Sequence, residues 1–244
     1  MILDNMFPRE VKYAQEKNLP LVIVGGTVEY HGPHCSFGCD TLVAEGLIRK
    51  LAERKEMVIA PKISYSPSSY AVGGRKSGTV HVPERAFEDY VYYVFKSLLY
   101  SGYRNIYVVI HHQFEQESEM PMTLCYRTAA KRATMEYLEE TLGEGWWGSE
   151  SYANYYEELE GANNPFGWIK VIPTMSTEVQ NATGYDHAGK YECSILMSLY
   201  PECVQLDRID DIKHWFTESA REANKELGDE MVEKSLAYLE KAIV

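Results

Sequence analysis

The chain has 244 residues, of which 45% are apolar and 25% charged, as in ordinary globular proteins, and it is long enough to bury one large core. Its 36 acidic residues against 24 basic ones give a formal charge of −12, which argues against a nucleic-acid partner. No run approaches the roughly 20 apolar residues of a membrane span, and the first residues do not resemble a signal peptide. Five cysteines at irregular spacing indicate reduced thiols, so we expect a cytoplasmic protein without a membrane partner.

Strand-like and helix-like segments alternate along the chain. Short apolar runs predict strands, and apolar residues three to four positions apart predict helices. Without a repeat or a linker, alternation of this kind implies a single α/β domain over residues 1–244, with a mostly parallel sheet and helices on both faces. The predicted strands are 20–25, 57–60, 105–110 and 168–173, and the predicted helices are 40–54, 83–100, 115–142, 187–199 and 218–243.

Residues 143–167 do not fit this alternation. The segment contains Trp146, Trp147 and several tyrosines without a sustained period. Long irregular segments in compact domains are typically lids or interface arms. Tryptophans are more often core residues or subunit contacts than gating residues, and both interpretations remain open here.

The most informative motif follows the first predicted strand. Glu29, His31 and Asp40 lie in the loop after it. The carboxyl end of a strand is where ligands bind in open α/β sheets. Carboxylate and imidazole groups are ligands of catalytic divalent metals, so the motif predicts a metal site.

Two later segments contribute further ligands. His112 follows the third predicted strand, with Glu115 nearby, and Glu192 lies in the predicted helix that begins near His187. Two ions held close together need a carboxylate that bridges them. Asp40 is the bridging candidate, with Glu29 and His31 each binding one ion and His112 and Glu192 completing the two sites.

Each residue also has a simpler interpretation. Asp40 alone is a plausible helix N-cap. His34 fits an orienting or structural hydrogen bond better than a metal ligand. His111 should point to the opposite face of the sheet from His112 if the strand continues, which favours packing. Cys35 and Cys39 resemble half of a zinc knuckle, but no second pair follows at the required spacing.

The segment from Glu29 to Asp40 resembles the signature of the creatininase (creatinine amidohydrolase) family, in which Glu-x-His-Gly-x-His is followed by an Asp eleven residues after the Glu. His187-Ala-Gly-Lys-Tyr-Glu192-Cys193 resembles the second family signature, with Cys in place of Thr. Residues 76–79, Lys-Ser-Gly-Thr, resemble a small Gly-Thr loop that lies close to the substrate in the family.

The resemblance implies a three-layer αβα fold and a centre of two divalent ions, commonly zinc or manganese, with iron(II) possible. It implies hydrolysis of a small cyclic amide or a related carbon–nitrogen bond by a metal-activated water, and a homo-oligomer, often a hexamer. The residues it assigns are Glu29, His31, Asp40, His112 and Glu192 as metal ligands, His187 and Glu115 as catalytic groups, and Ser77, Gly78, Tyr185 and Asp186 as substrate contacts.

The middle loop departs from the family pattern. The family has small glycines, or His-Tyr-Glu-Asn in creatininases, where this chain has Gln113 and Phe114 after His112. The difference argues against creatinine and favours a ring of another shape. Hydrolysis of a carbon–carbon bond in a cyclic diketone, such as an inositol-derived ring, is one alternative, and a non-catalytic, metal-stabilised ligand-binding protein is another. Glu115 fits a proton shuttle or an ordinary acidic residue at a helix start equally well.

Overall fold

Four parallel strands form the centre of the molecule. A computed structural model describes residues 1–112, 120–159 and 161–244. The strand order is β2-β1-β3-β4, and every neighbouring pair is parallel. All residues of β1 and β3 are buried, as expected for strands covered on both faces. The strands are β1 (Leu21–Gly25), β2 (Val58–Ile59), β3 (Ile106–Ile110) and β4 (Ile169–Pro173).

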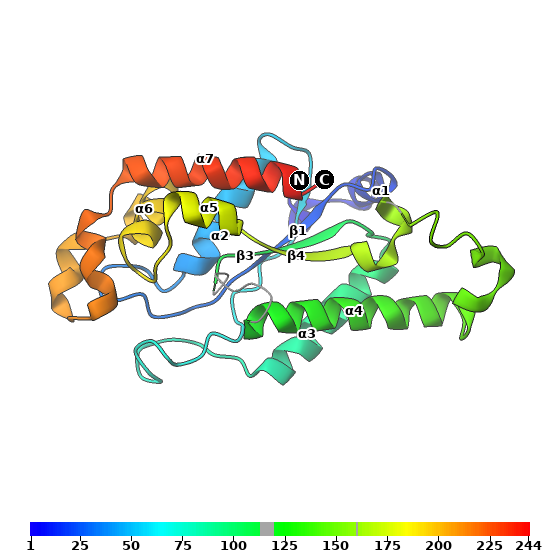
Figure 1. Cartoon of the computed structure of the whole chain (residues 1–244), viewed down its shortest axis with the longest axis horizontal. Helices are drawn as coiled ribbons and strands as arrows, with labels where there is room; N and C mark the ends of the chain where they lie inside the picture. The colour runs from blue at the N-terminus through cyan, green and yellow to red at the C-terminus, as the bar shows by residue number, and fades with distance from the viewer. Residues whose placement is uncertain (113–119, 160) are drawn as a thin grey trace.

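The register brings three strand ends level with one another. Gly25 pairs with Ile110, and Ile110 pairs with Pro173, so β1, β3 and β4 all end at the same edge of the sheet. The loops that follow these strands therefore begin side by side. The strands end toward the left of Figure 1.

Helices cover both faces of the sheet, which confirms the predicted three-layer α/β fold (Figure 1). Alternate strand residues enter two separate cores: Val22 and Val24 belong to one, Leu21 and Ile23 to the other. The first core is covered by α2 (Cys39–Ala52), α5 (Thr177–Thr183), α6 (Lys190–Leu199) and α7 (Lys225–Ala242), and the second by α1 (Pro8–Glu16), α3 (Glu84–Tyr100) and α4 (Pro121–Leu142).

Most predicted elements are present, with shifted ends. Within the described residues α4 begins at Pro121, in keeping with the preference of proline for the first turn of a helix. Residues 115–119 of the predicted helix lie outside the described part. The helix predicted over 218–243 is divided. A 3₁₀ segment ends at Glu222, and the Asn224 side chain caps α7 by accepting from the Leu227 N–H at 2.9 Å. The sequence prediction omitted α1 and α5. The 3₁₀ segments are Leu3–Asn5, Trp146–Gly148, Glu150–Tyr152, Gly161–Asn163, Pro165–Gly167, Pro201–Cys203, Leu206–Asp211 and Trp215–Glu222.

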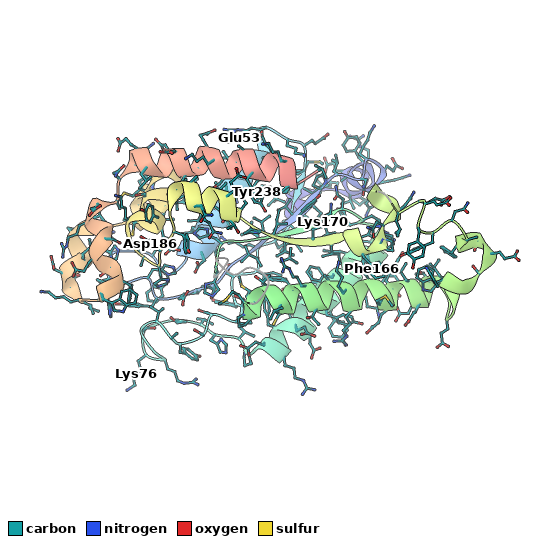
Figure 2. The ribbon with its side chains drawn as sticks, in the orientation of Figure 1. Glu53, Lys76, Phe166, Lys170, Asp186 and Tyr238 are labelled. Atoms are coloured by element: carbon teal, nitrogen blue, oxygen red, sulfur yellow. The ribbon has the colours of Figure 1, made fainter. Side chains whose placement is uncertain are left out.

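The aromatic segment 143–167 lies at the amino end of β4. Figure 2 labels Phe166 at this end and Asp186 beyond the opposite, carboxyl ends of the strands. Of the described residues that line the cavity at the carboxyl ends, none comes from this segment. The described residues of this segment therefore do not cover that cavity within the chain. Across the described residues, no helix has the length and apolar character that a membrane crossing requires.

Candidate metal centre

A cavity of about 330 Å³ opens where β1, β3 and β4 end. Each of the three loops that begin there contributes polar side chains to it. The described lining residues are Glu29, Asp40, Val72, His111, His112, Met175, Gly184, Tyr185, Asp186, His187, Tyr191, Glu192, Ile195 and Met231.

Asp40 lies between two histidines from different loops. Its Oδ2 is 3.6 Å from His31 Nε2 and 3.6 Å from His112 Nδ1. His112 Nδ1 is also 3.2 Å from Glu29 Oε2, and His31 Nε2 is 3.4 Å from Glu192 Oε2. Two donors bound to one ion at about 2.0–2.2 Å in tetrahedral geometry are roughly 3.3–3.6 Å apart. The four separations therefore agree with two cation positions that share Asp40.

Buried polar atoms in this group lack hydrogen-bond partners. His31 Nε2 and Asp40 Oδ2 are buried and accept or donate no hydrogen bond within the described residues. An unpaired buried polar atom costs about 1–3 kcal/mol. Asp40 belongs to the first turn of α2, and the structure shows no side-chain cap there, so helix capping does not explain this carboxylate. The residues fit a cation better than any protein partner.

Backbone contacts fix the loop that carries the first ligands. The Glu29 N–H donates to the Phe37 carbonyl at 2.9 Å, and the Thr41 hydroxyl donates to the Thr27 carbonyl at 3.1 Å. His31 Nδ1 lies 3.0 Å from the Glu29 carbonyl, which accepts its proton. The lone pair of His31 Nε2 is thereby left for a ligand, as is common for metal-binding histidines.

Glu192 is held in the first turn of α6. Its Oε2 accepts from the Ala188 N–H at 2.6 Å, while Ala188 itself has a positive φ of 53°. Asp186 accepts from the N–H groups of Tyr191 and Glu192 at 3.1 and 3.0 Å, so its carboxylate stabilises the start of the helix. Both oxygens of Asp186 thus accept hydrogen bonds from the backbone segment that positions Glu192.

The buried carboxylates and imidazoles shift each other's pKa values toward the charged forms. Burial by itself would lower the pKa of His31, but Glu192 and Asp40 outweigh it and raise that pKa well above its usual range. Burial likewise opposes ionisation of Asp40 and Glu192, yet the neighbouring histidines hold the pKa of each carboxyl below its ordinary value. The carboxylates are thus in the ionised form that binds metals, and a cation bound at this position would replace the proton that His31 holds.

His187 lies beside His31 but is held by other contacts. The ring centroids of His187 and His31 are 4.3 Å apart, and His187 Nε2 donates to the Tyr30 carbonyl at 3.1 Å. Phe216 contacts the His187 ring edge-on at 5.4 Å and stacks on His214 at 4.8 Å. These contacts leave Nδ1 of His187 as the nitrogen free of the carbonyl bond.

The position of His111 differs from the sequence interpretation. His111 was expected to point away from His112, but both line the cavity, because β3 ends at Ile110 and strand alternation does not continue. His111 Nδ1 is 2.8 Å from the Thr174 hydroxyl, and its Nε2 is 3.6 Å from Glu192 Oε1. The ring of His214, further along the chain, pairs with the Tyr30 hydroxyl at 3.0 Å. The sequence signal for His111 was its position next to a ligand candidate.

The predicted substrate contacts divide into two groups. Tyr185 and Asp186 line the cavity. Ser77 and Gly78 are not among its described lining residues; the Ser77 hydroxyl donates to the Gly74 carbonyl at 2.8 Å, and Lys76 beside it marks the outer edge of the molecule in Figure 2. Glu115, predicted as a catalytic group, lies outside the described residues. The roles assigned to all of these residues stay predictions.

The thiols near the site form a buried group rather than half of a zinc knuckle. Cys35 lies within hydrogen-bonding reach of both Cys39 and Cys193. The contacts of His34 are those expected of a structural histidine. Its Nε2 is 2.9 Å from the Ala188 carbonyl and 3.4 Å from the Cys193 sulfur. The burial of Cys39 raises its pKa well above the usual range, so the free group is a neutral thiol.

Comparison with known proteins gives matches over the whole chain. The family model Creatininase, described as creatinine amidohydrolase, matches residues 4–243. The creatinine amidohydrolase of Pseudomonas putida is 22% identical over 196 residues, which are 78% of this chain and 68% of that protein. A solved structure named as creatininase with Mn has a TM-score of 0.74 at 17% identity, covering 99% of this chain and 96% of its own. A glutamate-to-glutamine mutant of creatininase, named as the Zn-Zn type, has a TM-score of 0.75 at 18% identity, with the same coverage. At these identities the solved structures establish the fold, and the family model, which spans nearly the entire sequence, shows that the chain belongs to the creatininase family.

Proposed function

We propose that the protein is a metal-dependent hydrolase that opens a small cyclic substrate at an amide or related carbon–nitrogen bond. The observation that carries the proposal is the position of Asp40. Its buried, unpaired Oδ2 is 3.6 Å from one nitrogen each of His31 and His112. Together with Glu29 and Glu192, these residues would hold two divalent ions, zinc or manganese by family resemblance.

The protein groups around this position supply orientation and proton transfer. Bound divalent ions lower the pKa of water to about 7 and polarise a carbonyl oxygen, which is the chemistry that hydrolysis needs. His187 donates through Nε2 to the Tyr30 carbonyl, so its Nδ1 is the atom that can receive a proton and pass it to the leaving nitrogen. Phe216 and His31 hold the ring from two sides, which restricts it to one orientation.

The cavity lining favours a small substrate without negative charge. Its volume of about 330 Å³ is at the lower end of ligand sites. Val72, Met175, Ile195 and Met231 provide apolar lining, and no lysine or arginine is present among the described lining residues. An anionic substrate would find no cationic side chain in this part of the wall, so a neutral ring is favoured.

A substrate panel tests the proposal. Protein reconstituted with Zn²⁺ or Mn²⁺ is incubated with lactams, cyclic formamides and cyclic 1,3-diketones, and ring opening is followed by mass spectrometry. We expect turnover of a neutral lactam or formamide. Turnover of the diketones alone would establish carbon–carbon hydrolysis instead, and stoichiometric metal without turnover of any compound would support a non-catalytic binding protein.

Asp40→Ala is the matched test of the site itself. We expect it to lose both ions, as measured by elemental analysis, and at least about 10³-fold in activity, since the shared carboxylate holds both positions. Asp89→Ala is the control, because Asp89 is an exposed carboxylate paired with Arg132 at 3.1 Å. An Asp40→Ala protein with full metal content and full turnover would refute the assignment.

The proposal extends to the setting of the enzyme. By family resemblance we propose a homo-oligomer, often a hexamer in the family, that acts on a small molecule, and from the irregularly spaced cysteines we propose a cytoplasmic location. Size-exclusion chromatography with light scattering tests the assembly, and a monomer at micromolar concentration would contradict it.

A further inference from the structure

One donor near the centre has no place in the family's ligand set. His31, Cys39 and Glu192 each offer a donor atom, and these three atoms all lie within 4.8 Å of one another. All three side chains are buried, and Cys39 is fully so. A nitrogen, a sulfur and an oxygen that converge in this way form a mixed donor set suited to a metal of borderline softness.

A buried ring nitrogen without a hydrogen-bond partner points to a ligand at this position. His31 Nε2 is buried and without a hydrogen-bond partner in the described parts of the chain, and it faces Glu192 Oε2 at 3.4 Å. Its other nitrogen is occupied by the Glu29 carbonyl, so Nε2 is the atom available for a cation. The sulfur of Cys39 adds a third donor beside His31 Nε2, which has no hydrogen-bond partner among the described residues, and Glu192 Oε2, which accepts from the Ala188 N–H.

The chain geometry explains why Cys39 can reach this position. It is the first residue of α2 and directly precedes Asp40. The same helical turn therefore delivers a carboxylate to the shared position and a thiol to the group of His31 and Glu192. The nearby thiols of Cys35 and Cys193 do not belong to a set of three donors within that distance among the described residues.

We propose that Cys39 supplies a sulfur ligand to the cation held by His31 and Glu192. This inference rests on the proposed metal centre and deepens it. As the sulfur–metal bond forms, the thiol proton leaves to solvent, so one proton is released and no electron is transferred.

A sulfur ligand makes the two cation positions chemically different. The position of Glu29, Asp40 and His112 has oxygen and nitrogen donors alone and accepts manganese or zinc. The position of His31, Cys39 and Glu192 favours zinc, because thiolates select softer metals while carboxylates suit manganese.

Zinc K-edge X-ray absorption on the full-length, zinc-loaded protein tests the ligand directly. We expect a zinc–sulfur shell at about 2.3 Å beside the nitrogen and oxygen shell at about 2.0–2.1 Å. Two bound zinc ions without a sulfur shell would overturn this inference and leave the proposed metal centre intact. Absence of stoichiometric zinc would refute the metal centre as well, so the two failures are distinguishable.

Variants identify which cysteine is responsible. Cys39→Ser and Cys39→Thr should remove the sulfur shell and decrease the preference for zinc over manganese by about tenfold or more, measured by competition with elemental analysis. Cys125→Ser is the control, since Cys125 is a buried thiol in the opposite core. A sulfur shell that persists in both Cys39 variants would overturn the assignment.

Discussion

The two ends of the sheet each carry a pocket, and the pockets differ in how their polar atoms are paired. At the carboxyl end, His31 Nε2 and Asp40 Oδ2 are buried without partners among the described residues. At the amino end, a cavity of about 460 Å³ is lined by Arg104 and by aromatic residues of the 143–167 segment. There Arg104 donates to backbone carbonyls and lies over the rings of Tyr137 and Trp168, 4.7 and 4.6 Å from their centroids.

Pocket size therefore does not identify the reactive end of this molecule. In the larger cavity, the Arg104 guanidinium already donates hydrogen bonds to backbone carbonyls. In the smaller cavity, His31 Nε2 and Asp40 Oδ2 have no hydrogen-bond partner among the described residues. A change at one end should leave the other end unaffected unless the two ends are coupled.

Removal of cations should produce the largest effect, and only at the carboxyl end. Two ions, each present at a hundred times its Kd, stabilise the folded protein by about 2.7 kcal/mol each. For a chain of this length we expect a chelator to lower Tm by roughly 10–20 °C and to abolish activity. Differential scanning calorimetry with and without EDTA measures the shift. An unchanged Tm in metal-loaded protein would contradict the two-ion centre.

In the metal-free protein, the change of stability with pH should be nearly as large as the effect of removing the cations. Burial lowers the pKa of His112, but Asp40 and Glu29 outweigh it and raise that pKa to about 10. Between the unfolded value of about 6.5 and 10, the folded protein holds a proton that the unfolded chain has lost. Stability contributed by His112 is thus complete below about pH 6.5 and is lost as pH rises through 10, with an upper bound of roughly 5 kcal/mol.

Urea unfolding at several pH values between 6.5 and 9.5 measures how steeply the free energy of unfolding changes with pH. With EDTA we expect the free energy of unfolding to fall with increasing pH, and with zinc we expect most of the decrease to disappear, because the cation replaces the proton on His112. His112→Gln in EDTA is the control and should lack this contribution. Equal slopes with and without zinc would mean that His112 does not bind the cation.

Asp186→Ala should have an intermediate effect, transmitted to the centre through α6. The substitution removes the acceptor for the Tyr191 and Glu192 N–H groups and should cost about 1–2 kcal/mol of stability in EDTA. Because Glu192 loses its support, metal affinity should also fall, by about 10–100-fold. Asp186→Asn keeps one acceptor oxygen and should restore part of both. Competition with a chromophoric chelator measures the affinity, and unchanged affinity would show that Glu192 is positioned independently.

The sequence predicted the fold well because the signals for it are local. Val22 and Val24 alternate with Leu21 and Ile23 in a run that is buried throughout, and such runs between periodic helices indicate a covered parallel sheet. Boundaries were less accurate where the decisive contact is a cap or a proline. Asn224 starts α7 and Pro121 starts α4, and both signals were weaker than the hydrophobic period around them.

The site was predicted as far as motif spacing allows. Glu29, His31 and Asp40 lie within twelve residues after one predicted strand, so their proximity could be expected from the sequence, while their role as ligands stays a prediction. The approach of His111 to Glu192 could not be expected, because it depends on where β3 ends and on the position of α6. The hydrogen bond of Tyr30 to His214 joins residues 184 positions apart, and no sequence pattern encodes such a pair.

Arg104→Lys should produce the smallest effect and tests whether the amino end is independent. Lysine keeps the charge but not the planar group that lies over Tyr137 and Trp168 and donates to the Leu99 and Tyr103 carbonyls, so we expect a loss of about 1 kcal/mol in stability. Metal content, activity and the EDTA-induced shift in Tm should remain at wild-type values, because the sheet separates the two pockets. A fall in metal content in this variant, with the loss of stability unchanged, would mean that the aromatic end communicates with the metal centre through β3 and β4, the strands that join them.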